Sequence, residues 1–176
     1  MNRFIICVVL LLAVWPAACR GQTAQAVAPI EVYFSPKGGC TEAIVREIKA
    51  AKSSVLVQAY WFTSESITKA LLDAHKRSVN VQVLLDLSRT EIENAQADVL
   101  VEGGVPTFID DKHTTAHNKV IIVDGKVVIT GSFNFTDQAE NENAENLLVV
   151  RDKVIAEKFT ANWKAHAAHC VRYAKQ

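Results

Sequence analysis

The pattern of apolar and polar residues predicts a chain that begins with alternating strands and helices. In the first half of the chain, apolar runs typical of buried strands are each followed by apolar residues at helical spacing. Strand-then-helix units in series are typical of a layered α/β domain with a partly parallel sheet. The three units are a strand at 30–34 with a helix capped by Thr41, a strand at 54–62 with a helix from Ser64 or Ser66, and a strand at 80–86 with a helix at 90–101.

From Val105 onward the pattern favours strands. The run 105–109 predicts a short edge strand, because Pro106 has no N–H to donate to a sheet ladder. Asp124-Gly125 separates the apolar runs 120–123 and 127–130, which is the usual signature of a tight hairpin. These strands complete a fold of class α/β: a layered α/β/α sandwich with a mixed, partly parallel β-sheet flanked by helices.

The last third of the chain holds one more strand and one more helix. A strand is expected at 147–150, and Asp152 is the expected N-cap of the final helix. The segment 131–146 is polar and has no regular pattern, so it is predicted to be a functional loop or a short helix across the end of the sheet. The buried side of the final helix is expected to carry Val154, Ile155, Phe159 and Trp163.

The first 26 residues do not continue this pattern. Arg3 precedes an almost unbroken apolar run at 4–18, and 24–26 reads Ala-Gln-Ala, the small-x-small spacing of a cleavage site. We therefore expect a signal peptide at 1–26, a single catalytic domain at 27–176 and a periplasmic or secreted protein. A membrane anchor is the weaker alternative, because a spanning helix needs about 20 apolar residues. A lipoprotein attached through Cys19 is another.

Composition and charge narrow the function. With 176 residues, 49% of them hydrophobic and 22% charged, the chain can bury one ordinary core. Formal net charge is zero, and removal of residues 1–26 leaves 17 basic against 19 acidic residues, a net charge of −2. A broadly basic nucleic-acid-binding surface is thereby excluded, so any attraction for phosphate has to be local.

Two cysteines remain after residue 26. Cys40 and Cys170 form an even pair near opposite ends of the chain, and an oxidising compartment favours disulfides. The sequence thus permits a Cys40–Cys170 disulfide, with two separate structural thiols as the alternative.

The residues that carry chemistry lie between His117 and Asn134. The sequence reads His117-x-Lys119-x4-Asp124 and then Gly-Ser132-x-Asn134. On a strand, side chains two residues apart point to the same side, so His117 and Lys119 share one site. The hairpin at 124–125 is expected to bring the pair Ser132 and Asn134 to the same place.

These residue types suit attack on a phosphodiester. The imidazole of His117 can attack phosphorus or protonate a leaving oxygen. Lys119 supplies a fixed positive charge for the non-bridging oxygens, and Ser132 and Asn134 can donate hydrogen bonds to the same phosphate. A nucleophilic histidine also needs an acceptor on its second ring nitrogen, and Glu145 is the candidate.

This combination resembles the signature of the phospholipase D superfamily. The resemblance includes 117–125 and 131–136, extends through 59–64 and 143–146, and covers essentially the whole chain after residue 26. It is strongest with the small, exported bacterial endonucleases that carry a single copy of the motif. Members use two motifs per active site and no metal or other cofactor, and Asp124 is implied to support the site rather than to touch substrate.

The chain contains the motif once, so the resemblance implies a homodimer with one shared active site. The expected function is an exported, metal-independent, non-specific endonuclease that cleaves DNA, with RNA as a further candidate, through a phosphohistidine. The alternatives are a phospholipid hydrolase of the phospholipase D type and a non-catalytic nucleic-acid-binding module. No stable membrane association is expected after signal removal.

The other histidines and two aromatic residues have less specific interpretations. His113 precedes His117 by four residues, a spacing that binds zinc on a helix, but the strand expected at this point opposes it. His113 is therefore interpreted as a loop residue near the substrate, and His166 and His169 as the solvated face of the last helix. Trp61 and Phe62 are expected in the core or the cleft wall, with base stacking as the alternative.

Overall fold

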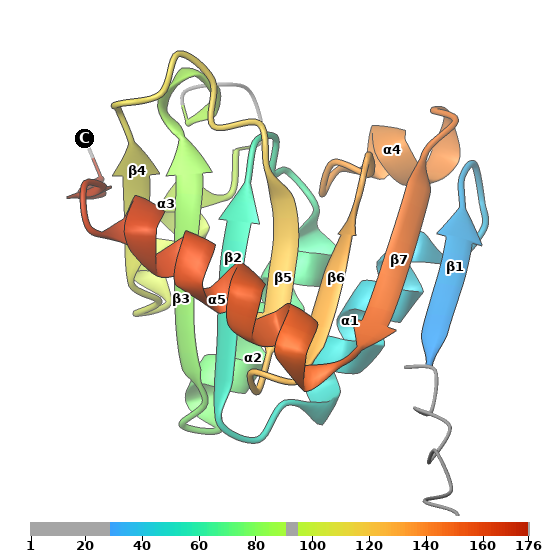
Figure 1. Ribbon diagram of the computed structural model, residues 1–176. Coiled ribbons are helices and arrows are strands. Elements are labelled where there is room, and N and C mark those ends of the chain that lie inside the picture. Colours follow the sequence, from blue (N-terminus) through green and yellow to red (C-terminus); the bar gives the residue numbers. More distant parts are fainter. Residues whose placement is uncertain (1–28, 91–94, 176) are drawn as a thin grey trace, which may run out of the picture.

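The computed structural model describes residues 29–90 and 95–175. They form one mixed sheet with helices on both faces, which confirms the predicted fold class (Figure 1). The expected signal peptide at 1–26 lies outside the described residues. Within the described ranges, no helix is both long and apolar enough to cross a membrane.

The elements follow the expected order. The strands are β1 (Ile30–Phe34), β2 (Ser54–Ala59), β3 (Asn80–Asp86), β4 (Thr107–Asp110), β5 (Lys119–Val123), β6 (Val127–Gly131), β7 (Asn146–Arg151) and β8 (Val171–Arg172). The helices are α1 (Cys40–Ala50), α2 (Glu65–Lys76), the 3₁₀ turn η1 (Leu87–Arg89), α3 (Ala97–Glu102), α4 (Asp137–Asn141) and α5 (Lys153–Ala167).

The strand order is β1-β7-β6-β5-β2-β3-β4-β8. The neighbours β2, β3 and β4 run parallel, because each is connected to the next through a helix, and every other pair is antiparallel. The motif strand β5 lies against β2, with Ala59 opposite Lys119. The sequence motif is therefore placed beside the carboxyl ends of the parallel strands.

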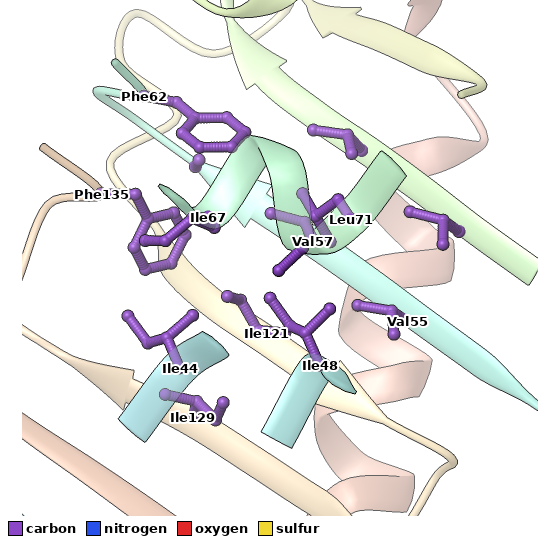
Figure 2. Close-up of a cluster of buried hydrophobic side chains, with 14 of the residues drawn as sticks. Ile44, Ile48, Val55, Val57, Phe62, Ile67, Leu71, Ile121, Ile129 and Phe135 are labelled. Atoms are coloured by element: carbon purple, nitrogen blue, oxygen red, sulfur yellow. The ribbon is translucent and has the colours of Figure 1, made fainter. Parts of the chain in front are cut away.

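Two apolar clusters occupy the two faces of the sheet. The larger one lies under α1, α2 and α3, and Figure 2 shows Ile44 and Ile48 of α1 and Leu71 of α2 pointing toward the sheet. The smaller one lies between the sheet and α5. Strand β5 serves both: Ile121 belongs to the larger cluster and Ile122 to the smaller, as alternation along a strand requires.

The β5–β6 hairpin has the predicted turn. Asp124 and Gly125 have φ of 52° and 61°, and the amide of Lys126 donates to the carbonyl of Val123 at 3.0 Å. Two central residues with positive φ define a type I′ turn, which matches the twist of the flanking strands.

The predicted start of α1 is wrong by two residues. The helix begins at Cys40, and Gly39 at the N-cap provides no side-chain cap. Glu140 takes the expected role of Thr41 from a distance: its carboxylate accepts hydrogen bonds from the amides of Gly39 at 3.1 Å and Thr41 at 2.7 Å. The cap of α2 at Ser64 is confirmed.

Two other expectations in the first half of the sheet need correction. The third helix is shorter than 90–101, since α3 begins at Ala97 after the η1 turn, and 91–94 lie outside the described residues. The strand after Pro106 is not at the edge, because the two-residue strand β8 pairs with β4 on its outer side. Nothing in the short sequence Val171–Arg172 predicts a strand.

The predicted buried face of the final helix is confirmed for Trp163 and Phe159 and wrong for Val154 and Ile155. Asp152 is confirmed as its cap, accepting from the amide of Ile155 at 2.8 Å. Val154, however, is 62% exposed, and the side chains that contact the sheet are Ala156 and Trp163 with the half-buried Phe159. The helix crosses the sheet obliquely, so its contact stripe is narrower than the apolar pattern indicates (Figure 1).

The two cysteines are not linked. Both thiols are free. Cys40 starts α1 in the larger cluster, whereas Cys170 packs against the smaller cluster on the opposite face of the sheet. The disulfide prediction is therefore wrong and the alternative of two separate thiols holds, because the sheet itself stands between them. Burial, with help from nearby carboxylates, raises the pKa of each thiol to about 11.

Candidate active site

His117 and Lys119 lie together at the start of β5. The amide of Tyr60 donates to the carbonyl of Asn118 at 3.0 Å, which places the end of β2 beside this pair. The His117 ring is exposed and lies 4.5 Å from the Tyr60 ring, centroid to centroid. The Lys119 ammonium donates to the carbonyl of His117 at 2.9 Å and lies 4.8 Å from the centroid of the Tyr60 ring.

Lys119 is a buried cation without a salt-bridge partner among the described residues. It is 7% exposed. Burial lowers the pKa of Lys119 below its ordinary value, and the negative charge of Glu145 partly offsets this effect. An ammonium group held out of water beside an exposed imidazole is prepared to receive a phosphate oxygen, whose charge would replace the lost hydration.

Ser132 and Asn134 follow β6 at the same end of the sheet. The amide of Asn146 donates to Ser132 Oγ at 3.1 Å, while the Ser132 hydroxyl donates to Glu145 Oε2 at 2.5 Å. Gly131 permits this close approach of β6 and β7, because a Cβ there would lie 2.1 Å from the carbonyl oxygen of Asn146. Ser132 thus reaches the predicted site, but it is bound to a carboxylate.

Asn134 has an unsatisfied buried atom. Its Oδ1 is buried without a hydrogen-bond partner, as is Trp61 Nε1; the only other such side-chain atom in the described part of the chain is Thr160 Oγ1. An unpaired buried polar atom costs about 1–3 kcal/mol, and such atoms in native proteins often mark functional positions. Because the two ends of a carboxamide look alike, Asn134 can present its NH₂ end to an anionic oxygen.

Glu145 has partners other than the predicted one. Its oxygens accept from Ser132 and, at 3.1 Å, from Asn143 Nδ2, and none of its hydrogen bonds in the described chain goes to the His117 ring. It nevertheless lies near enough to Lys119 to affect its pKa. Its predicted role as the holder of the imidazole stays a prediction.

Asp124 does not belong with the reacting groups. It lies at the other end of β5, about 16 Å along the strand from Lys119 at roughly 3.3 Å per residue. Its carboxylate accepts from the amides of Lys52, Ser53 and Ser54 and from the Ser53 hydroxyl at 2.7–3.1 Å. Asp124 therefore joins the hairpin to the α1–β2 connection, at the opposite end of β5 from His117 and Lys119.

Tyr60 and Arg89 also line the site near His117, although neither belongs to the sequence motif. Arg89 Nε donates to the Tyr60 hydroxyl at 2.8 Å, and its guanidinium lies 4.8 Å from the Tyr60 ring centroid and 5.1 Å from that of Trp61. Arg89 follows β3, and the carboxyl ends of parallel strands are where ligand sites gather in α/β sheets. Its position directly after a predicted parallel strand is the sequence signal that could have identified Arg89 as a site residue. Phe62, by contrast, is confirmed as a core residue, edge-on to Phe135.

Comparison with known proteins identifies the class. The family model "Cardiolipin synthase, PLD-like domain" matches residues 44–167, a range that includes every side chain of the site described above. The chain belongs to this phospholipase D-like family. It has the fold of the superfamily's phosphodiesterases and is a hydrolase of that family.

Individual relatives differ in name. The chain is 42% identical over 134 residues to the phospholipase D of Rickettsia prowazekii, covering 76% of this chain and 65% of that protein's length. It is 32% identical over 140 residues to the mitochondrial cardiolipin hydrolase of Xenopus laevis, covering 74% and 67%. The crystal structure of Nuc from Salmonella typhimurium, a phospholipase D family member, superposes with a TM-score of 0.80 at 34% identity, covering 84% of this chain and 99% of Nuc.

Proposed function

We propose that this protein is an exported, metal-independent endonuclease that cleaves DNA through a phosphohistidine at His117. The observation that supports a nucleic-acid substrate is the arrangement of Tyr60, Trp61 and Arg89 beside His117. Aromatic rings and a guanidinium plane suit the bases that flank a scissile phosphate, since every base offers a π-face. A glycerol head group has no flat face of this kind.

The proposed reaction has two displacements at phosphorus. A ring nitrogen of His117 attacks, a P–N bond forms, the P–O bond to the leaving nucleotide breaks, and the leaving oxygen takes a proton from the His117 imidazolium of a second copy of the chain. Water then attacks phosphorus and gives its proton back to that second imidazole, and the P–N bond breaks. Lys119, Ser132 and Asn134 stabilise the phosphoryl oxygens.

The second copy is part of the proposal because one imidazole cannot act as nucleophile and acid at the same time. The sequence contains one motif, and both His117 and Ser132 are exposed, so another chain can approach them. A two-fold homodimer with a single shared site supplies the missing histidine.

The decisive experiment is hydrolysis of plasmid DNA, of single-stranded DNA and of RNA in excess EDTA. The temperature is kept below the unfolding transition of the EDTA-treated protein. We expect cleavage of DNA under these conditions. Absence of cleavage, with recovery on addition of Mg²⁺, would overturn the proposal.

Variants test which residues act. His117→Ala and Lys119→Ala are expected to abolish turnover while circular dichroism stays unchanged, whereas His75→Ala on α2 is the matched control with normal turnover. Acid-labile, alkali-stable radioactive phosphate bound to the wild-type protein but not to His117→Ala would support the covalent step. Normal turnover by His117→Ala would place the chemistry elsewhere.

A phospholipid hydrolase is the second candidate. It is favoured by the 42% identity to a protein named phospholipase D, which exceeds the 34% identity to Nuc. Release of head groups from phosphatidylcholine or cardiolipin vesicles, without cleavage of DNA, would favour this candidate. If neither substrate is cleaved but DNA binds, the third alternative, a non-catalytic binding module, is supported.

A further inference from the structure

Four potential metal ligands converge on the α5 side of the sheet, away from the reacting groups. Asp110 ends β4, His113 follows it in the β4–β5 loop, and His166 and His169 stand at the end of α5. One ligand atom from each residue lies within 4.8 Å of all the others. The interpretation of His166 and His169 as a solvated face is therefore wrong: their side chains are 18% and 31% exposed.

The geometry around Asp110 Oδ2 is that of a ligand set. His113 Nδ1 lies 2.9 Å from this oxygen, His166 Nδ1 3.4 Å and His169 Nε2 3.4 Å. In a tetrahedral zinc site with bonds of about 2.0 Å, neighbouring ligand atoms are about 3.3 Å apart. Three of the six ligand–ligand distances are thus close to those of a bound ion.

Hydrogen bonding alone accounts poorly for this arrangement. A carboxylate oxygen has about two lone pairs, and three ring nitrogens surround this one. The other carboxylate oxygen, Oδ1, accepts from the amides of Lys112 and His113, both at 3.2 Å, which orients Oδ2 toward the imidazoles. A cation between the four groups would bind one nitrogen of each ring, and the backbone amides would act as its outer shell.

The charge at Asp110 is suited to a cation. Its side chain is 2% exposed. Burial alone would raise the pKa of Asp110, but hydrogen bonds from the ring and amide of His113, the amide of Lys112 and the ring of His169 lower it well below its usual range.

We propose that Asp110, His113, His166 and His169 bind one Zn²⁺, which ties the end of α5 to β4 and to the loop that leads to His117. Three imidazoles and one carboxylate suit zinc, and four protein ligands leave no open position, as in structural sites. The ligands occur as two pairs, Asp110 with His113 and His166 with His169, and two residues lie between the members of each pair. On binding, His166 gives up the 2.8 Å hydrogen bond between its Nδ1 and Gln58 Nε2.

The site is separate from the proposed chemistry. The loop between His113 and His117 is held by the amide of Ala116, which donates to Asp86 Oδ2 at 2.6 Å. Zinc would therefore stabilise the base of this loop rather than contact the phosphate. Cleavage in EDTA and zinc binding are independent, so either proposal can fail while the other stands.

Titration of the tag-free full chain with ZnCl₂ after dialysis against EDTA tests this inference. We expect one equivalent per chain by competition with a chromophoric chelator and by mass spectrometry of the metal content, and a higher melting temperature on binding. His113→Ala is expected to weaken zinc binding at least about 100-fold. Mutation of residues that only hydrogen-bond to a metal ligand already lowers metal affinity about 10–100-fold, and His113 is itself a proposed ligand. His113 is 47% exposed, so its loss should leave the fold intact by circular dichroism.

Two matched variants locate the ion. His75→Ala and His117→Ala are expected to keep the full zinc affinity and the rise in melting temperature, whereas His166→Ala combined with His169→Ala loses both. The inference is overturned if wild type binds no zinc, or if His117→Ala loses the ion while His113→Ala retains it.

Discussion

At the scale of single residues, burial is what separates Lys119 from an ordinary surface lysine. The motif predicted a cation beside His117, and the structure places it at 7% exposure under Tyr60. A buried ammonium has lost most of its water, so it gains more from a phosphate oxygen than an exposed one would. The same burial makes its charge easier to remove.

This gives a pH prediction for Lys119. The cation is present below its pKa and lost above it, and burial holds that pKa below the ordinary value of 10.5. KM for a chromogenic phosphodiester should therefore rise with pH earlier than titration of a free lysine would cause. Lys119→Arg stays charged and should lose this alkaline rise, although its kcat should fall because the bulkier guanidinium fits poorly. A KM that stays constant to pH 10.5 would contradict the role.

At the scale of elements, carboxylates distant in sequence bind backbone amides, including those at the start of α1, where a local capping residue was expected. Asp124 has the positive φ of a turn residue, but its carboxylate also holds three amides of the α1–β2 connection. Glu140 of α4 caps α1 from about a hundred positions away in the sequence. Each carboxylate stabilises the junction between two elements.

Asp124→Asn should lower the free energy of unfolding by roughly 2 kcal/mol at pH 7, because hydrogen bonds to a charged, partly buried group are lost. Burial raises the pKa of Asp124, but the hydrogen bonds from the amides of Ser54, Ser53 and Lys52 outweigh it, so the net pKa is below 3.8. The contribution is present above about pH 4 and is lost as pH falls through the folded value. Urea unfolding should show the difference shrinking below pH 4, with the exposed Asp137→Asn as control. A constant difference at all pH values would contradict this account, because the lost contribution would then not depend on the charge of the carboxylate.

Glu140→Gln should lower stability by about 1 kcal/mol, since it removes the charge at the amino end of α1. Thr41→Ala is the informative comparison. If Thr41 were the cap, as its sequence position indicates, its loss would cost the same amount, whereas the structure predicts almost no change. Chemical unfolding of both variants distinguishes the two, and the reverse order would invalidate the capping assignment.

At the scale of the whole molecule, the single motif is the decisive feature. One chain holds one exposed imidazole at the site, and the proposed two-step reaction needs two. A dimer in which both copies contribute would behave differently from two independent enzymes.

Co-refolding with His117→Ala tests the shared site. In an equimolar mixture with random pairing, about one quarter of the dimers carry two His117 side chains. With a shared site, the mixture should therefore have about one quarter of the activity of the same total amount of wild-type protein. With independent sites, it should have about one half. Co-refolding with His75→Ala should cause no loss. Sedimentation is run in parallel, and an active monomer at assay concentration would refute the shared site.

The sequence alone determined the layers, most strand positions and the motif, because strand alternation, helical spacing and turn residues are local signals. It also predicted that His117 and Lys119 share one site, although His117 precedes β5 and the two side chains meet at the Tyr60 ring. Only the tertiary structure showed that Glu140 caps α1, that Asp124 lies remote from His117 and Lys119 and that Cys40 and Cys170 face opposite sides of the sheet. The four ligands around Asp110 also required it, because convergence of residues some fifty positions apart depends on where α5 crosses the sheet, which no local pattern encodes.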